Sequence, residues 1–340
     1  MEKLRTILVL RFSSIGDIIQ LTSPLHTLRD QFPNVRIDII TLDEYAEILM
    51  GNPFVDRIIQ ISRNFKYKQL KDIGKKLSLY KYDLIIDFHN VIRSKIILNH
   101  ITGSKKLVYK KPRWKRFKLV QFKRNDFEDK FSQRWLYHQC LKKILINSYD
   151  IPKNKLVIKD SEKNNAKLFL DNYGLKDPFV TLIPGAKWKQ KSWLSKKYNE
   201  VIDYIIHHLK YKVVMLGGDN DEICNKISRI NSSVISFHGK LTLRESIAVI
   251  SCSNLTVGSD TGLVHASEAV GVPAIMIMGP TSIQMGGGVM LNNSFIIEKE
   301  IWCRPCSQNG QSPCFRSHQH CMNEISSSEI INTVNNILKR

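Results

Sequence analysis

Asp260, Thr261 and Gly262 form a short turn whose residue types suit the binding of a phosphate group. The apolar run at 255–257 predicts a buried strand before this turn, and residues 263–270 predict a helix after it. The turn would then lie at the carboxyl end of the strand, where free N–H groups and the helix dipole favour an anion. Gly262 would let the backbone approach a ligand closely. An ordinary tight turn of an α/β protein remains the alternative interpretation.

The beginning of the chain predicts a second strand-turn-helix unit of the same kind. Residues 6–11 are typical of a buried strand, and Ser14, Gly16 and Asp17 lie in the loop expected after it. A helix should follow, with an apolar face formed by Ile18, Leu21, Leu25 and Leu28. Pro24 is expected either to kink this helix or to begin it. Because the loop lacks the G-x-G-x-x-G spacing of a dinucleotide-binding turn, a nicotinamide-dependent enzyme is disfavoured.

Together these two segments resemble the heptosyltransferases, which are the bacterial glycosyltransferases of family 9. The S-x-G-D loop of that family matches Ser14, Gly16 and Asp17, and the D-[ST]-G-x-x-H part of its second run matches residues 260–265, which Ala266 follows. The family's later G-x-P and G-P-T motifs match residues 271–273 and 279–281. The resemblance implies an α/β protein of the GT-B fold, in which two Rossmann-like domains face each other across a cleft. It also implies a C-terminal helix that packs back on the first domain.

The length of the chain, 340 residues, fits two domains. We expect an acceptor-binding Rossmann-like domain at 1–155 and a nucleotide-sugar-binding Rossmann-like domain at 156–340. The second would contain a cysteine-rich loop at 303–321 and a terminal helix at 326–338. Apolar runs predict further strands at 36–41, 84–88, 107–109, 179–183, 213–216 and 274–278. Thr242 and Glu245 predict a capping box at the start of a helix.

The resemblance implies an inverting transfer of heptose, or a related sugar, from a nucleotide-sugar donor. In this family the donor is ADP-heptose and the acceptor is a lipopolysaccharide core or a related glycan. The enzyme must hold the donor diphosphate and remove a proton from the acceptor hydroxyl. Asp17 is the candidate general base, because its loop at the cleft edge suits attack from the face opposite the leaving nucleotide. A helix-capping aspartate is the alternative.

Four further residues are candidates for binding the donor. Lys191 matches the family lysine that contacts the donor phosphate, whereas a solvated lysine is the alternative. Asp221 and Glu222 follow two glycines after a predicted strand, where a carboxylate can accept hydrogen bonds from ribose hydroxyls. Either of these acids could instead be favourably placed at a helix start. His265 lies in the first turn of the predicted phosphate-site helix, where it could donate to a phosphate oxygen or simply pack.

The acceptor side is expected at the end of the strand at 84–88, together with Ser14 and Gly16 of the first loop. The candidates after this strand are Asp87, His89, Asn90 and Arg93. No D-x-D motif lies at a predicted strand end, so no metal or other cofactor is expected for catalysis.

Four of the seven cysteines lie close together in the sequence, at Cys303, Cys306, Cys314 and Cys321. Four thiolates with this spacing suit a tetrahedral structural site for zinc or iron, closed by protein ligands. Disulfides, which a reducing cytoplasm disfavours, and free thiols are the alternatives.

The chain has a formal net charge of +20, and residues 105–125 contain ten Lys or Arg and no acid. Trp114, Phe117 and Phe122 are interleaved with these cations, so the segment could meet anionic lipid, a phosphorylated glycolipid acceptor or nucleic acid. We prefer a peripheral contact with an anionic membrane surface over a merely solvated basic face, and expect no nucleic-acid partner. Without a signal peptide or an apolar stretch of about 18 residues, the protein is expected in the cytoplasm, at the inner face of the inner membrane.

Two other classes stay open at this point. A sugar-nucleotide epimerase would share the GT-B fold but would not need the S-x-G-D loop. A basic nucleic-acid-binding α/β protein would explain the charge but not the Asp-Thr-Gly turn.

Overall fold

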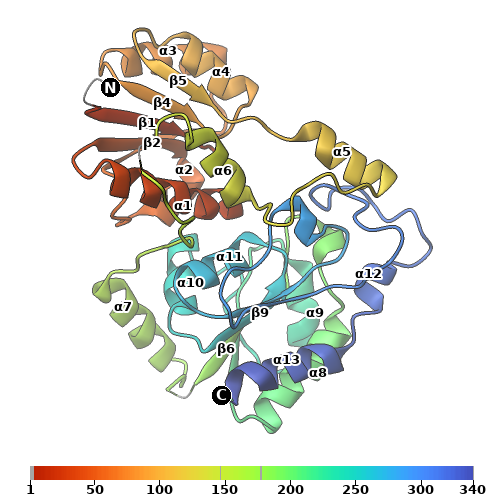
Figure 1. Cartoon of the computed structure of the whole chain (residues 1–340). Helices are drawn as coiled ribbons and strands as arrows, with labels where there is room; N and C mark the ends of the chain where they lie inside the picture. Colours follow the sequence, from red (N-terminus) through yellow and green to blue (C-terminus); the bar gives the residue numbers. More distant parts are fainter. Residues whose placement is uncertain (1–3, 146, 177, 340) are drawn as a thin grey trace. The chain divides into compact units, whose positions relative to one another are not determined.

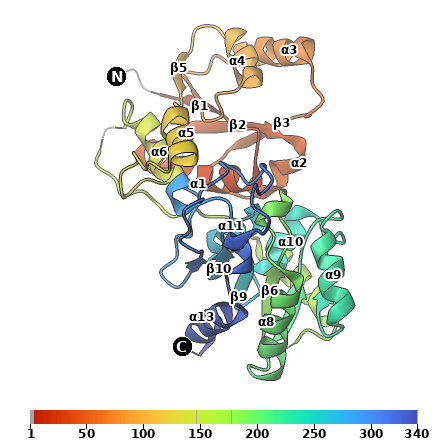
Figure 2. The same ribbon diagram turned by 90° about the vertical axis from the view of Figure 1, so that its right-hand side faces the viewer.

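The structure is a computed structural model that describes residues 4–145, 147–176 and 178–339. Contacts divide the chain into two compact units. The first contains residues 1–112 and 133–157, and the second contains residues 113–132 and 158–340. Figures 1 and 2 show both units from two directions.

The first unit is built on a five-stranded parallel sheet with the strand order β3-β2-β1-β4-β5. Leu8 and Leu10 of β1 are fully buried and share a core with Leu70 and Ile97, from α3 and α4. Helices α1 and α6 pack against each other, and Figure 1 shows them on the other side of the sheet. The elements are β1 (Thr6–Leu10), α1 (Ile15–Gln31), β2 (Arg36–Leu42), α2 (Asp43–Ala46), η1 (Glu47–Leu49), β3 (Arg57–Ile61), α3 (Tyr67–Ser78), β4 (Leu84–Asp87), α4 (Ile92–Asn99), β5 (Lys105–Val108) and α6 (Gln133–Leu141).

The second unit contains a six-stranded parallel sheet with the order β11-β10-β9-β6-β7-β8. One apolar core joins this sheet to α8, α9 and α13, and a second joins it to α7, α10 and α11. The elements are α5 (Arg113–Phe122), α7 (Asp160–Asp171), β6 (Phe179–Ile183), η2 (Lys189–Lys191), α8 (Ser195–His207), β7 (Lys212–Met215), α9 (Glu222–Ile230), β8 (Ile235–Ser236), α10 (Leu243–Ile250), β9 (Leu255–Ser259), α11 (Gly262–Ala269), β10 (Ala274–Ile277), η3 (Ile283–Met285), β11 (Phe295–Ile297), α12 (His320–Asn323) and α13 (Ser327–Leu338).

In each sheet the chain first adds strands on one side of the starting strand and then continues on its other side, which creates a topological switch point. In the first sheet β1 lies between β2 and β4, and in the second sheet β6 lies between β7 and β9. Loops that leave the carboxyl ends of such strands diverge, and ligands of open α/β sheets bind there. The S-x-G-D loop follows β1 and the Asp-Thr-Gly turn follows β9, so both motifs lie at these switch points.

Two expectations about the elements need correction, and a third stays a prediction. Helix α1 begins at Ile15, which places Gly16 and Asp17 in its first turn rather than in a loop, and it runs through Pro24 to Gln31. Residues 113–132 belong to the second unit, although the sequence suggests that all of 1–155 forms the first domain. The apolar face of the terminal helix α13 is buried against α8 of its own unit, and the expected packing of this helix on the first domain stays a prediction.

The predicted capping box of α10 is confirmed. The Thr242 hydroxyl accepts a hydrogen bond from the Glu245 N–H at 3.2 Å, and the Thr242 N–H donates to the Glu245 carboxylate at 2.8 Å. Among the helices of the described residues, none combines the length and the apolar composition needed to cross a membrane.

Candidate active site

Asp17 is held at the switch point of the first sheet by the residues just before it. Its Oδ2 accepts hydrogen bonds from the Ser14 N–H at 3.2 Å and from the Ser14 hydroxyl at 2.9 Å. Nη2 of Arg11 lies 2.6 Å from the same oxygen. The side chain of Asp17 is 33% exposed, so an incoming hydroxyl could reach the carboxylate. Ser14 is the N-cap residue of α1; Asp17 therefore contributes to capping, and the capping role does not exclude a chemical one.

Arg11 controls the charge of this carboxylate. Its side chain is only 7% exposed, and Nη1 donates to the Phe88 carbonyl at 2.7 Å, which fixes the guanidinium between β1 and β4. Burial alone would raise the pKa of Asp17, but the Arg11 charge and the Ser14 hydrogen bonds outweigh it and lower the pKa from its ordinary value of 3.8. Asp17 is therefore ionised at neutral pH and is able to accept a proton.

Asp87 is buried and bonded within its own loop, which the sequence does not indicate. This residue ends β4 and is fully buried. Its Oδ1 accepts hydrogen bonds from the N–H groups of His89 and Asn90, each at 2.8 Å, and its Oδ2 accepts one from the Ser94 hydroxyl at 2.6 Å. These bonds use both carboxylate oxygens to shape the loop after β4, and the buried side chain does not support the expected role of Asp87 as an acceptor ligand.

The other acceptor-side candidates differ in how they are placed. Nδ1 of His89 accepts a hydrogen bond from the Phe12 N–H at 3.2 Å. Burial, with the charges of Arg11 and Lys111, lowers the pKa of His89 to about 3, so the ring is neutral. Asn90 donates to the Tyr109 carbonyl at 2.9 Å, and Arg93 donates to the Arg63 carbonyl. The structure thus brings His89 into the Arg11–Asp17 group, whereas Asn90 and Arg93 contact the segments that follow β5 and β3.

Lys191 and Asp260 meet at the switch point of the second sheet. Lys191 follows β6 and Asp260 follows β9, and Nζ lies 2.6 Å from Oδ2 of Asp260. The Thr281 hydroxyl donates to the same oxygen at 2.9 Å. Burial would raise the pKa of Asp260, but Lys191, His265 and Thr281 together lower it. As a carboxylate Asp260 would repel a phosphate, so its arrangement suits it to orienting Lys191.

The start of α11 lies beside this ion pair. Thr261 is the N-cap residue and Gly262 is the first helical residue, so the first N–H groups of the helix have no intrahelical partner. His265 is buried in the first turn, and it contributes to lowering the pKa of Asp260. These N–H groups and Lys191 together form an arrangement suited to an anion such as a diphosphate.

The structure separates the roles of Asp221 and Glu222. Asp221 is the N-cap residue of α9, and its Oδ2 accepts a hydrogen bond from the Gly218 N–H at 2.7 Å. Its carboxylate also packs under Gly185, where an added Cβ would lie only 2.3 Å from Cγ of Asp221. Glu222 is exposed at the start of the helix. Asp221 thus shapes its loop, and Glu222 is left available to a ligand.

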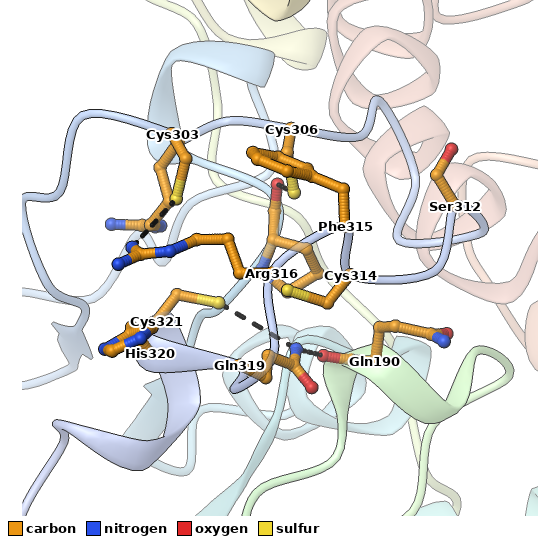
Figure 3. Close-up of a pocket in the computed structure, with 12 residues that line it drawn as sticks. Gln190, Cys303, Cys306, Ser312, Cys314, Phe315, Arg316, Gln319, His320 and Cys321 are labelled. Atoms are coloured by element: carbon orange, nitrogen blue, oxygen red, sulfur yellow. Dashed lines mark hydrogen bonds between the residues drawn. The ribbon is translucent and has the colours of Figure 1, made fainter.

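The four clustered cysteines line one small cavity of about 10 Å³, roughly the space that a single water molecule needs. Figure 3 shows their sulfur atoms turned toward one another, with the Arg316 side chain running between them. Nη1 of Arg316 donates to Sγ of Cys303 at 3.8 Å. All seven cysteines are free thiols. Among the described residues no three or more His, Cys, Asp or Glu side chains are placed so that they could hold a metal ion, so the expected metal site is not preformed.

Helix α5 contains residues 113–122 of the basic segment and presents an aromatic cluster to solvent, whereas residues 105–112 belong to the first unit. Trp114 and Phe122 are 64% and 67% exposed. Phe117 stacks on Trp114 with ring centroids 5.3 Å apart and meets Phe122 edge-on at 5.9 Å. Part of the positive charge is used internally, because Asp126 pairs with Lys118 at 3.0 Å and with Arg124 at 2.7 Å.

Two residues of the site are not evident from the sequence. Arg11 ends an apolar run, which indicates that it is buried, and a buried charge needs a partner. Thr281 belongs to the G-P-T motif, but the motif alone does not indicate what this side chain contacts. Its contact with Asp260 joins positions 21 residues apart, which the sequence does not indicate.

This chain is similar to known proteins over most of its length. A family model described as glycosyltransferase family 9 (heptosyltransferase) matches residues 70–313. Lipooligosaccharide heptosyltransferase 2 of Campylobacter jejuni is 25% identical over 337 residues, which cover 96% of each chain. The structure of a family 9 glycosyl transferase from Veillonella parvula has a TM-score of 0.82 at 19% identity and covers 98% of this chain and 97% of that one. The structure of E. coli ADP-heptose LPS heptosyltransferase II has a TM-score of 0.79 at 19% identity, with 98% of each chain covered. The predicted two-domain GT-B fold is confirmed by these structures.

Proposed function

Since the chain belongs to glycosyltransferase family 9, the heptosyltransferases, we propose that it transfers a heptose from ADP-heptose to a lipopolysaccharide or lipooligosaccharide core. The chain is a glycosyltransferase by its family. The observation that carries the finer proposal is the ion pair of Lys191 and Asp260 beside the start of α11. A sugar-nucleotide epimerase and a nucleic-acid-binding protein are not favoured, because neither class accounts for the family match.

The donor diphosphate would bind to Lys191 and to the first N–H groups of α11. As the bond from the sugar to the diphosphate breaks, negative charge grows on the leaving ADP. Lys191 and the helix start are positioned before the reaction, so they can stabilise this charge without rearrangement. Asp260 and Thr281 hold Lys191 in place, His265 lies next to this group, and Glu222 is our candidate for the ribose hydroxyls.

Asp17 would take the proton from the acceptor hydroxyl as that oxygen attacks the anomeric carbon. The reaction is then a single displacement, and it inverts the anomeric configuration. Arg11 and Ser14 keep the carboxylate ionised and fixed in direction. Ser14, Gly16 and His89 surround this position and are the proposed contacts of the acceptor, and no cofactor is needed for the transfer.

The donor assignment is tested by comparing two lysines of one loop. Lys191→Met removes a charge-assisted hydrogen bond to phosphate, which contributes about 1.5–3 kcal/mol, so the Kd for ADP should rise about 10- to 150-fold. Lys189→Met is the matched control, since Lys189 is an exposed lysine of the same short 3-10 helix. Isothermal titration calorimetry measures both. Equal ADP affinity in both variants and the wild type would place the diphosphate elsewhere.

The nature of the donor is tested by transfer itself. The enzyme, ADP-heptose and a deacylated core oligosaccharide should give free ADP and an acceptor heavier by one heptose, as measured by mass spectrometry. UDP- and GDP-sugars in place of ADP-heptose should give no product. Transfer from one of these other donors would leave the family assignment intact but change the proposed substrate.

We further propose that α5 contacts an anionic membrane surface, with the protein in the cytoplasm at the inner face of the inner membrane. The glycolipid acceptor lies at such a surface. Trp114, Phe117 and Phe122 offer exposed aromatic rings that could enter the headgroup region, and Lys115 beside them is exposed as well. Each cation near an anionic bilayer contributes about 1 kcal/mol, so binding should weaken as salt increases.

A structural zinc or iron ion is proposed for Cys303, Cys306, Cys314 and Cys321. The four sulfur atoms line one cavity, and thiolates are the ligands that such ions prefer in tetrahedral sites. The Arg316 guanidinium contacts Cys303, so binding would require this side chain to move away. When bound, the ion would stabilise the loop and take no part in the transfer.

A further inference from the structure

The cysteine-rich loop at 303–321 is packed against the side chain of Lys191 through Gly310. Gly310 is buried, and its φ of +82° lies in the left-handed region. An added Cβ would lie 2.7 Å from Cγ and 3.0 Å from Cε of Lys191. The Gly310 backbone therefore lies directly along the aliphatic part of this lysine, and no larger residue fits there without displacing it.

The same loop also holds the turn that supports Asp260. Nη2 of Arg304 donates to the Thr281 carbonyl at 2.7 Å, and Nε donates to the Gly279 carbonyl. The Cys306 N–H donates to the Pro280 carbonyl at 3.1 Å. Since the Thr281 hydroxyl donates to Asp260 and Asp260 pairs with Lys191, a continuous series of contacts leads from Arg304 to the ammonium group of Lys191.

A third contact fixes the loop to the segment that carries Lys191. The Gln319 side-chain amide donates to the Gln190 carbonyl, one residue before Lys191. Three separate points of the loop, at Arg304, Gly310 and Gln319, thus contact the surroundings of one lysine. All three contacts lie within the second unit.

From these contacts we propose that the cysteine-rich loop positions the donor-phosphate lysine, so that Gly310 and Arg304 are positioning residues for binding a nucleoside diphosphate. Gly310 sets the path of the Lys191 side chain, and Arg304 fixes the turn whose threonine holds Asp260. The proposal rests on the proposed function of Lys191 as a phosphate ligand. It assigns the loop a role in donor affinity in addition to its role in stability.

Gly310→Ala has a matched control in the same unit. Both Gly310 and Gly174 have a positive φ, of +82° and +71°, so alanine strains the backbone at either position. A Cβ at Gly174 would meet nothing within 4 Å, whereas a Cβ at Gly310 would press on Lys191. The difference between the two variants therefore isolates the contact with the lysine.

The experiment is a double-mutant cycle on ADP affinity, measured by calorimetry on the full-length protein. Gly310→Ala should raise the Kd for ADP about 5- to 30-fold, which is typical of residues in direct contact, and Gly174→Ala should change it less than about twofold. In a Lys191→Met background, Gly310→Ala should raise the Kd for ADP by less than a further factor of about two, because the ammonium group that it displaces is already absent. The KM for the acceptor should not change in Gly310→Ala.

The outcomes separate the two proposals. If Lys191→Met leaves ADP affinity unchanged, the proposed function of Lys191 is wrong. If Lys191→Met weakens binding but Gly310→Ala behaves like Gly174→Ala, or is equally harmful in both backgrounds, the positioning role is wrong. Should Gly310→Ala fail to fold, Arg304→Lys decides, since it keeps the charge but loses the planar fork. Arg304→Lys alone should weaken ADP binding, whereas in the Lys191→Met background it should have little effect. If the effects of Arg304→Lys and Lys191→Met on ADP affinity are additive, the proposal is wrong.

Discussion

Replacing Arg11 by methionine tests whether this buried cation sets the protonation of the proposed base. Methionine fills a similar length of apolar space but removes the charge 2.6 Å from Asp17. In the wild type the pKa of Asp17 is lowered, because Arg11 and Ser14 outweigh the effect of burial. Without Arg11 burial is opposed only by the Ser14 hydrogen bonds, so the pKa of Asp17 should rise.

The direction of the pH effect follows from that shift. The wild-type base is ionised from well below pH 7 upward, so kcat/KM should stay level on the acid side until the pH approaches a low pKa. In Arg11→Met the acid limb should begin at a higher pH. At alkaline pH we expect kcat/KM of Arg11→Met to fall by no more than about 10-fold. A carboxylate with a raised pKa is a stronger base, and this offsets the poorer orientation of Asp17.

The same pair contributes to stability. Arg11 makes one charge-assisted contact with Asp17 and one with the Phe88 carbonyl, and such bonds contribute about 1.5–3 kcal/mol each when buried. Asp17 is 33% exposed and keeps its Ser14 bonds in Arg11→Met. We therefore expect the free energy of unfolding of this variant to be about 2 kcal/mol lower than that of the wild type at pH 7. A carboxyl with a lowered pKa adds stability that is present above its unfolded pKa and lost as the pH falls through the folded one. The difference in the free energy of unfolding between Arg11→Met and the wild type should therefore become smaller as the pH falls.

The assay is the pH dependence of kcat/KM for the soluble acceptor, combined with thermal unfolding at several pH values. Arg36→Met is the control, since Arg36 pairs with Asp38 while being half exposed, and Asp38 keeps Arg57 as a partner. This control should leave both the pH profile and the stability nearly unchanged. An acid limb that stays in place or moves to lower pH in Arg11→Met would refute the electrostatic account of Asp17.

Three further predictions concern other parts of the second unit. Protein purified without chelator should carry about one zinc or iron ion per chain by elemental analysis; Cys306→Ser should lose it and melt at a lower temperature, whereas Cys252→Ser should keep it. If the wild type holds no metal, the four thiols are simply free. The double variant Trp114→Ser, Phe122→Ser should no longer sediment with anionic vesicles yet should keep transfer to a soluble acceptor, with the exposed Leu168→Ser as the control; unchanged sedimentation would make α5 an ordinary solvated face. Glu222→Gln should weaken ADP binding about 3- to 10-fold without changing the melting temperature, whereas Asp221→Ala should lower that temperature, because it removes the hydrogen bond that its carboxylate accepts from the Gly218 N–H, which contributes about 1 kcal/mol. The reverse pattern would move the ribose contact to Asp221.

Much of the second sheet is predictable from the sequence, because parallel strands buried on both faces are continuous apolar runs. The run at 179–183 corresponds to β6 as observed, and the run at 274–278 differs from β10 by one residue. Helix α1 begins earlier than the sequence indicates. Ser14 and Asp17 form a capping box with an aspartate in place of the usual Glu or Gln, so in the sequence this helix start resembles a loop.

The contacts that define the site could not be predicted in the same way. Lys191 and Asp260 are 69 residues apart, and Arg11 meets the Phe88 carbonyl across 77 residues. Only strand order brings these positions together. Asp87 shows the opposite error, since a polar residue after a strand looks the same in sequence whether it binds a ligand or caps its own loop. Burial and hydrogen-bond partners distinguish the two cases here.

The central claim is that Asp17 accepts the proton of the acceptor, and Asp17→Asn tests it most directly. Asparagine keeps the shape of the side chain but cannot act as a base. The turnover of ADP-heptose with a soluble core acceptor should fall by at least about 100-fold, the size of a general-base contribution. The Kd for ADP, measured on the same preparation, should stay within about twofold of the wild type, and circular dichroism should report a folded protein. Turnover within about threefold of the wild type in a folded variant would contradict the account.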